Sequence, residues 1–260
     1  MIRRSAYLLA GPTASGKSAA AAVLARRMGA AILSADSMLV YRGMDAGTAK
    51  PSSAERAEFS MGGVDLVSPS EHFSSGAWLR AAARWFAEIP EDRPVVIVGG
   101  TGLYFSALLR GLDRKWSLPP PEYPVLRTER HILHARISAR LDVMLADGVW
   151  FEEVRRLLRE YPVWSDTARV AIGYREIADF IAENASDSGM AAAARLAALR
   201  EKILVRTRQL AKRQVTWFRH QSSPLDVTAE ETAEETAENT ARVWKKHGPW
   251  QVSLPEKEES

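Results

Sequence analysis

The sequence predicts an α/β fold in which helices flank a parallel β-sheet. Over the first hundred residues, short apolar runs typical of buried strands alternate with longer helical patterns. A glycine-rich turn joins the first strand to the first helix, and a long amphipathic helical pattern follows in the C-terminal part. The 260 residues suffice for one such domain with an appendage.

The expected elements follow from apolar periodicity and from turn residues. We predict strands at residues 6–10, 30–34 and 94–98. We predict helices at residues 19–28, 73–88, 174–182 and 190–218, and a helical stretch over residues 125–159 that is interrupted near Gly148. Residues 113–124 contain three consecutive prolines and are expected to form a linker or turn. Ser74 or Ser75 would cap the helix at 73–88.

Charge is distributed unevenly along the chain, although the net charge is only +3. Acidic residues outnumber basic ones from Pro224 onward, where the tetrapeptide Ala-Glu-Glu-Thr starts a repeat at residue 229. We expect residues 223–260 to form an acidic low-complexity tail, either as a surface helix or as a mobile segment. Basic residues concentrate between Arg200 and Arg219, a block that could face a polyanion or be a solvated helix face.

Residues 11–18 carry the most specific motif of the chain. They match the pattern G-x-x-x-x-G-K-S/T and consist of Gly11, Pro12, Thr13, Ala14, Ser15, Gly16, Lys17 and Ser18. In such a P-loop, backbone N–H groups and a helix N-terminus surround phosphate oxygens. Lys17 would add a full positive charge, and the Ser18 hydroxyl would hold Mg²⁺. The motif therefore predicts a P-loop NTPase-like sheet that binds a di- or triphosphate.

Three polar residues follow the ends of predicted strands. Lys17, Asp36 and Thr101 should meet in one crevice, because ligands of open α/β sheets bind beyond the carboxyl ends of the strands. The strand at 94–98 ends in Gly-Gly-Thr rather than in the acidic residue that an ATPase or GTPase usually needs. Asp36 is then the available carboxylate. It would either take a proton from a nucleophile or cap a helix.

Two absences bear on the compartment. No apolar stretch approaches the ~18–20 residues of a membrane span, and the N-terminus runs straight into the first strand without a pattern typical of a signal peptide. The chain has no cysteine, which excludes disulfides and thiolate metal sites and fits a reducing compartment. We therefore expect a cytoplasmic protein without a membrane partner, and a monomer by default.

Several blocks of sequence resemble one known family. They are Gly11–Ser18, Ser34–Ser37, Tyr41–Asp45, Gly47–Pro51, Val98–Phe105, Gly173–Arg175, and Arg208–Gln214 followed by Thr216-Trp217. Across residues 6–220 they resemble the tRNA dimethylallyltransferases (isopentenyl-tRNA transferases). The resemblance implies transfer of a dimethylallyl group from dimethylallyl diphosphate to N6 of the adenosine 3′ of the tRNA anticodon, with release of diphosphate. The P-loop would then hold a substrate diphosphate rather than ATP.

The resemblance also implies roles for individual residues. Catalysis would depend on Asp36 as the general base at N6, on Thr101 in the channel where donor and adenine meet, and on Lys17. The donor diphosphate would lie against residues 11–18 and Arg208, with Mg²⁺ at Ser18. The residues that would contact the tRNA anticodon stem-loop are Asp36, Ser37, Met38, Leu39, Thr101, Gly173, Tyr174, Arg175, Lys212 and Arg213.

One departure from the family pattern concerns an inserted helical domain that family members usually carry. We divide the chain into a P-loop core with a basic C-terminal helix (1–112 and 166–222), a reduced helical insert region (113–165) and the acidic tail. The family's insert normally grips the anticodon stem, so its reduction leaves two alternatives open. One is an adenylate dimethylallyltransferase that acts on free AMP, ADP or ATP. The other is a P-loop RNA-binding paralogue without transfer activity.

Overall fold

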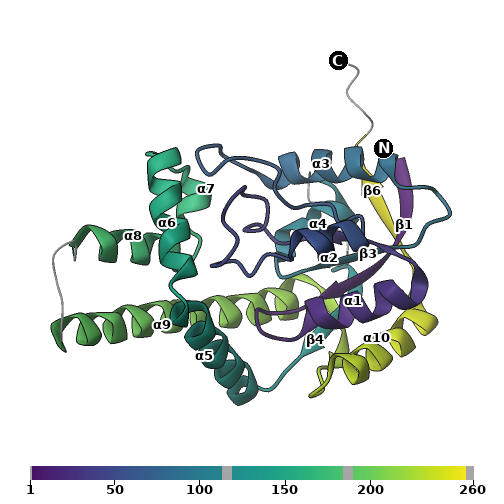
Figure 1. Ribbon diagram of the computed structural model, residues 1–260. Coiled ribbons are helices and arrows are strands. Elements are labelled where there is room, and N and C mark those ends of the chain that lie inside the picture. The colour runs from purple at the N-terminus through teal and green to yellow at the C-terminus, as the bar shows by residue number, and fades with distance from the viewer. Residues whose placement is uncertain (1, 113–118, 184–189, 256–260) are drawn as a thin grey trace.

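The computed structural model describes residues 2–112, 119–183 and 190–255, and its strands form one sheet with helices on both faces (Figure 1). The strands are β1 (Ile2–Ala10), β2 (Ala31–Ser34), β3 (Val95–Gly99), β4 (Glu122–Arg127), β5 (Ser223–Thr228) and β6 (Trp250–Leu254). The helices are α1 (Lys17–Met28), α2 (Ser53–Glu58), α3 (Ser75–Glu88), α4 (Gly102–Arg110), α5 (Arg130–Ala146), α6 (Val149–Glu160), α7 (Asp166–Arg169), α8 (Tyr174–Glu183), α9 (Met190–Gln221) and α10 (Ala233–His247).

The six-stranded sheet is parallel along its main path, in the order β2-β3-β1-β4-β5. The C-terminal half of β1 pairs with β3, and the N-terminal half pairs antiparallel with β6. Because the main strands are parallel, the carboxyl ends of β1, β2 and β3 lie at the same edge of the sheet. The loops that begin at this edge carry the P-loop, Asp36 and Thr101.

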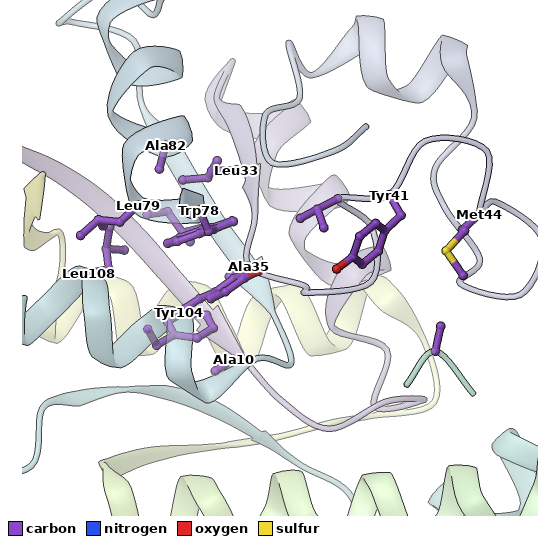
Figure 2. Close-up of a cluster of buried hydrophobic side chains, with 14 of the residues drawn as sticks. Ala10, Leu33, Ala35, Tyr41, Met44, Trp78, Leu79, Ala82, Tyr104 and Leu108 are labelled. Carbon is purple, nitrogen blue, oxygen red and sulfur yellow. The ribbon is translucent and has the colours of Figure 1, made fainter. Parts of the chain in front are cut away.

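Alternate residues of the central strands point to opposite faces, as the pleat of a strand requires. Leu8 belongs to the cluster that contains α3 and α4, whereas Leu9 belongs to the cluster that contains α1 and α10. Figure 2 shows the first cluster, in which the rings of Trp78 and Tyr104 stack with centroids 4.4 Å apart. The Trp78 indole N–H also donates to the Ser34 carbonyl at 3.0 Å. This core therefore holds the end of β2, directly before Asp36.

The structure confirms the predicted fold class and most of the predicted elements. The strands predicted at 6–10, 30–34 and 94–98 correspond to β1, β2 and β3, and the helices predicted at 19–28, 73–88, 174–182 and 190–218 correspond to α1, α3, α8 and α9. Ser74 is the N-cap of α3, because its side chain accepts a hydrogen bond from the Ala77 N–H. Within the described residues, no helix has the length and apolar character needed to cross a membrane.

The prediction of a helix from residue 125 was wrong at its start. Residues 125–127 belong to β4, and α5 begins only at Arg130. The rest of the stretch forms α5 and α6, which are separated at Gly148 as expected. Pattern reasoning missed β4 because Pro124 lies inside it, and a proline within a run argues against a strand between two others. The expected linker falls partly on residues 113–118, which lie outside the described residues.

The expectation of a separate acidic tail was wrong for most of residues 223–260. Residues 223–228 form β5, which pairs with β4 along its whole length. Residues 233–247 form α10, which packs on α1, and residues 250–254 form β6, which pairs with β1. The segment is thus part of the sheet and of its helical cover. Residues 233–247 do form a helix, but only the outer face of α10 is exposed as a surface helix would be.

The Ala-Glu-Glu-Thr repeat explains how such an acidic segment can pack against a core. A repeat of four residues nearly matches the 3.6-residue period of a helix, so small residues collect on one face and glutamates on the other. Thr236, Ala237 and Thr240 are buried on the inner face. The Trp244 indole N–H donates to the Leu8 carbonyl of β1 at 2.8 Å. Composition alone could not reveal this, because the partner of the inner face comes from the other end of the chain.

Replacing Trp244 by alanine should lower the free energy of unfolding by about 3–5 kcal/mol, the usual cost of removing a large buried aromatic side chain. Trp244 is only 3% exposed and is hydrogen-bonded to β1. Urea denaturation followed by circular dichroism measures the effect. Lys245→Ala is the matched control, since Lys245 is the next residue of α10 and is exposed. Equal unfolding midpoints for W244A and the wild type would contradict a core role for α10.

Candidate active site

The P-loop connects β1 to α1 and turns tightly at two residues with left-handed backbone conformation. Ala14 has a φ of 62° and Gly16 a φ of 88°, a region that favours glycine. Lys17 is the first residue of α1, and its Nζ donates to the Pro12 carbonyl at 3.1 Å. Ser18 follows in the first helical turn and is exposed. The first N–H groups of α1 and a lysine ammonium therefore lie together, as a phosphate site requires.

Asp36 and Thr101 lie on the loops that follow β2 and β3. Asp36 Oδ1 accepts a hydrogen bond from the Met38 N–H at 2.9 Å, so Asp36 caps a turn rather than a helix. Thr101 Oγ1 accepts from the Ser37 N–H at 2.9 Å and lies 3.2 Å from Ser37 Oγ, to which it donates. The Thr101 N–H donates to the Ala35 carbonyl at 3.1 Å. These bonds hold the two loops together as one unit.

A cavity of about 670 Å³ opens between the P-loop and this unit, which is within the usual range for small-molecule sites. The expected site residues that line it are Thr13, Ala14, Lys17, Ser18, Asp36, Ser37, Met38, Leu39, Thr101 and Arg213. The prediction that the segments after three strands converge is therefore confirmed. Gly11, Pro12 and Ser15 are buried within the loop itself, and Gly16 is exposed.

Three helices from the second half of the chain supply an apolar wall of the cavity. Its residues are Ile137, Leu141 and Met144 from α5, Trp150 from α6, and Ile203 and Leu210 from α9. Those of α5 recur at a spacing of three or four residues, which places side chains on one face of a helix. Sequence reasoning missed this wall because such a stripe equally predicts packing against a protein core.

Among the charged side chains that line the cavity, Lys17, Arg140 and Asp36 interact with one another. Burial lowers the pKa of Lys17 to about 8, the nearby Asp36 carboxylate partly offsets this, and Arg140 lowers the pKa further. Arg140 reaches the cavity from α5, and its Nη2 donates to the Thr48 carbonyl at 3.3 Å. Burial also lowers the pKa of Arg140. An anionic ligand would relieve the repulsion between Lys17 and Arg140. Arg140 was missed because no motif marks it.

Comparison with known proteins agrees with this geometry. The family model described as IPP transferase matches residues 39–129 and 119–221. A model described as isopentenyl transferase matches residues 4–60. This chain belongs to the IPP transferase family.

Individual relatives and solved structures support the same assignment. The tRNA dimethylallyltransferase of Geobacter metallireducens is 34% identical, over 83% of this chain and 89% of the relative. That of a Synechococcus species is 31% identical, over 96% and 88%. The crystal structure of tRNA delta(2)-isopentenylpyrophosphate transferase from Staphylococcus epidermidis matches with a TM-score of 0.74 and 25% identity, over 93% of this chain and 99% of that one. A eukaryotic dimethylallyltransferase acting on tRNA shares the fold, with a TM-score of 0.73 at 19% identity.

Within the IPP transferase family this chain is a compact member. The two segments that match the family model, residues 39–129 and 119–221, overlap at residues 119–129. The alignment with the Geobacter metallireducens relative runs over 287 positions, more than the 260 residues of this chain. The relative therefore carries residues that this chain lacks, and a reduced helical insert at residues 113–165 stays a prediction.

Two residues expected to contact tRNA are instead buried within the protein, which contradicts that expectation. The Tyr174 side chain is 1% exposed, and its hydroxyl donates to Glu153 Oε1 at 2.6 Å and accepts from the Gly47 N–H at 3.1 Å. Gly173 lies so close to Trp150 that an added Cβ would be 2.0 Å from the indole ring. Both residues pack α8 against α6, and neither lines the cavity.

Glu153 of α6 is a buried carboxylate that sequence reasoning did not single out. Its Oε2 accepts hydrogen bonds from the Asp45 N–H at 3.0 Å and the Ala46 N–H at 2.9 Å. Together with the Tyr174 hydroxyl, these donors compensate the cost of burying a charged group. Glu153 thereby holds residues 45 and 46, and the residues that follow, 47–51, line the cavity. In the sequence only the Tyr41–Asp45 block marks this region, and the block does not indicate that Glu153 is its partner.

The remaining expected contacts divide between the cavity and the surface. Arg213 lines the cavity, whereas Arg175, Arg208 and Lys212 are not among its lining residues. Arg175 is exposed and lies 3.9 Å from Asp179 on the same helix. A contact between Arg208 and the donor diphosphate therefore stays a prediction.

The basic block of α9 serves partly to hold the fold together. Arg200 forms a two-pronged ion pair with Asp142 of α5, with contacts of 2.5 and 3.0 Å. Arg206 pairs with the buried Glu176 of α8. Lys212, by contrast, is exposed. Arg200 and Arg206 therefore have acidic partners within the protein, which neither interpretation of this block anticipated, whereas Lys212 faces solvent. A contact between the block and a polyanion stays a prediction.

Lys17 should make the affinity for inorganic pyrophosphate depend on pH. With a pKa of about 8 in the free protein, Lys17 loses its charge as the pH rises past that value. The dissociation constant should therefore rise more steeply above about pH 8 in the wild type than in Lys17→Arg, which stays charged. Isothermal titration calorimetry of both proteins measures this, and the comparison cancels the titration of pyrophosphate itself. Parallel pH profiles would contradict the assignment.

Proposed function

We propose that this protein transfers a dimethylallyl group from dimethylallyl diphosphate to N6 of the adenosine 3′ of the tRNA anticodon. The observation that carries the proposal is a single cavity in which the P-loop faces Asp36 and Thr101. Relatives that cover most of the chain are named tRNA dimethylallyltransferase. The reaction needs a diphosphate site, a base and a space partly closed to water, and the cavity is suited to all three.

The P-loop supports the departure of diphosphate. When the allylic C–O bond breaks, negative charge grows on the leaving oxygen. The N–H groups at the start of α1 and the Lys17 ammonium are positioned in advance to stabilise it. Arg140 adds a further positive charge at the same cavity. These groups stabilise the growing charge most strongly in a site that is partly closed to water. The apolar wall from α5, α6 and α9 provides such a site.

Ser18 is the residue that would hold Mg²⁺. Its hydroxyl lies in the first turn of α1 and lines the cavity, where a diphosphate would also present oxygens. Within the described residues there is no cluster of three or more acidic or histidine side chains suited to a metal. The donor set therefore fits an ion held by one protein hydroxyl, with the diphosphate and water as the other ligands. When bound, Mg²⁺ would neutralise charge on the leaving diphosphate.

Asp36 is the group placed to take the proton from N6. Its Oδ1 is held by the Met38 N–H, which fixes the carboxylate at the cavity wall. As the bond from the allylic carbon to N6 forms and the C–O bond breaks, the N6 proton would pass to Asp36. A neutral amine is a weak nucleophile, so holding N6 within about 3–3.5 Å of the carbon contributes much of the rate. Thr101 positions the loop beside Asp36 through its bonds to Ser37.

The exposed basic residues of α9 provide the approach for RNA. Lys212 is exposed, and Arg213 is exposed yet also lines the cavity, so α9 connects the surface to the site. Extruding an adenine from a stacked loop costs a few kcal/mol, which phosphate contacts can offset. We further propose that the protein acts in the cytoplasm as a monomer, in keeping with a tRNA substrate.

Asp36→Asn should lower kcat for transfer by about 10²- to 10⁴-fold and leave pyrophosphate affinity nearly unchanged. Asparagine keeps the oxygen that accepts from the Met38 N–H but cannot take the proton. Transfer of a labelled prenyl group and calorimetry measure the two quantities. Asp92→Asn, an exposed acid in the loop between α3 and β3 that does not line the cavity, is the control and should retain activity. Full activity of D36N would remove Asp36 as the base.

An anticodon stem-loop should be a better acceptor than AMP, because the exposed basic residues of α9 can contact its phosphates. Incubation with labelled dimethylallyl diphosphate and either acceptor measures this, and the preference should weaken as salt concentration rises. Transfer to AMP alone would favour an adenylate dimethylallyltransferase. Binding of the stem-loop without transfer to any adenosine acceptor would favour a non-catalytic RNA-binding paralogue.

A further inference from the structure

One side chain of α9 is hydrogen-bonded to both walls of the cavity. Gln214 Oε1 accepts from the Thr13 N–H of the P-loop at 2.8 Å. Its Nε2 donates to the Gly100 carbonyl, in the loop after β3, at 3.0 Å. Each partner dictates the orientation of the amide, because a backbone N–H can only donate and a carbonyl can only accept. Gln214 also lines the cavity.

The loop after β3 is shaped to receive this helix. A Cβ added to Gly100 would lie 2.4 Å from Gln214 Nε2, and one added to Gly102 would lie 2.0 Å from the Trp217 ring. Gln214 and Trp217 are three residues apart and therefore project from the same side of α9. Contacts as short as these leave no room for a side chain. The glycines of this loop thus allow α9 to approach as closely as it does.

From Gly100 the connection continues to the base. Thr101, the next residue, bonds to Ser37 through its hydroxyl and to Ala35 through its N–H. Asp36 lies between Ser37 and Ala35. A continuous path of hydrogen bonds and short backbone links therefore runs from the P-loop, through Gln214, to the proposed base.

We propose that Gln214 is a positioning residue that sets the separation between the diphosphate loop and the loops that carry Thr101 and Asp36. This inference rests on the proposed function. The leaving oxygen is held by one wall and the proton acceptor stands on the other, so their alignment depends on this separation. Glutamine suits the task because one side chain supplies both an acceptor and a donor. A misplacement of about 1 Å between reacting groups can cost about 10²-fold in rate.

The first test replaces Gln214 by methionine, which has a similar length but cannot make either hydrogen bond. In Q214M, kcat for transfer should fall about 10- to 100-fold, while pyrophosphate affinity should change much less. Gln209→Met is the matched control, since Gln209 is an exposed glutamine on the same helix and does not line the cavity. The control should retain the wild-type kcat and donor KM.

The second test is Gln214→Glu, whose effect should depend on pH. A protonated carboxyl can still accept from the Thr13 N–H and donate to the Gly100 carbonyl, whereas an ionised one repels that carbonyl. The ratio of Q214E to wild-type kcat should therefore rise as the pH falls from about 8 to about 6, because burial raises a carboxyl pKa. The same ratio for Q214M should stay constant. Dividing by the wild type removes the pH dependence that all these proteins share.

Each outcome decides a separate point. Two outcomes would show that the inference about Gln214 is wrong while the proposed function stands, provided that the wild type is active. In one, Q214M has the same kcat as Q209M. In the other, the ratio of Q214E to wild-type kcat does not change with pH. If Q214M fails to fold, the pH dependence of Q214E still tests the inference within one folded variant. A wild type that transfers nothing to any adenosine acceptor would overturn the proposed function and this inference with it.

Discussion

The strand order β2-β3-β1 is the constraint on which the site depends. Because β3 lies between the other two, the loop after β3 must lie between the P-loop and Asp36. The register places Ala10 beside Gly99 and Ser34 beside Val98, so the three strands end at nearly the same level. The phosphate-binding turn, the Thr101 loop and the carboxylate are therefore neighbours before any side chain is considered, and Thr101 and Ser37 then join two of the loops by hydrogen bonds.

The helices of the second half of the chain turn this open edge into a cavity. They contribute the apolar wall, the cations Arg140 and Arg213, and the amide of Gln214. The same helices are held to one another by ion pairs such as Arg200–Asp142 and Arg206–Glu176. The basic character of α9 thus serves two ends. Part of it stabilises the helical arrangement, and the rest remains at the surface close to the cavity mouth.

The segments that follow α4 complete the sheet and its helical cover. The segment between α4 and α5 is short, but it still supplies β4, which joins β1 to β5. The C-terminal segment then closes the structure, since β5 and β6 extend the sheet and α10 covers α1. The α1 helix follows the P-loop directly, and its buried face packs against α10. The packed face and the phosphate-binding end therefore belong to one helix.

The parallel sheet, the phosphate loop and the order of Lys17, Asp36 and Thr101 could be predicted from the sequence. Each is encoded in a short contiguous run whose local geometry follows from glycine, proline and apolar spacing. Three features become visible only in the folded chain: Tyr174 is an internal partner of Glu153, Arg140 and Gln214 reach the cavity, and the acidic repeat covers the core. These facts depend on which distant segments pack together. Composition and spacing do not specify those pairings, because the same helical stripe or charged run fits both a buried interface and a solvated face.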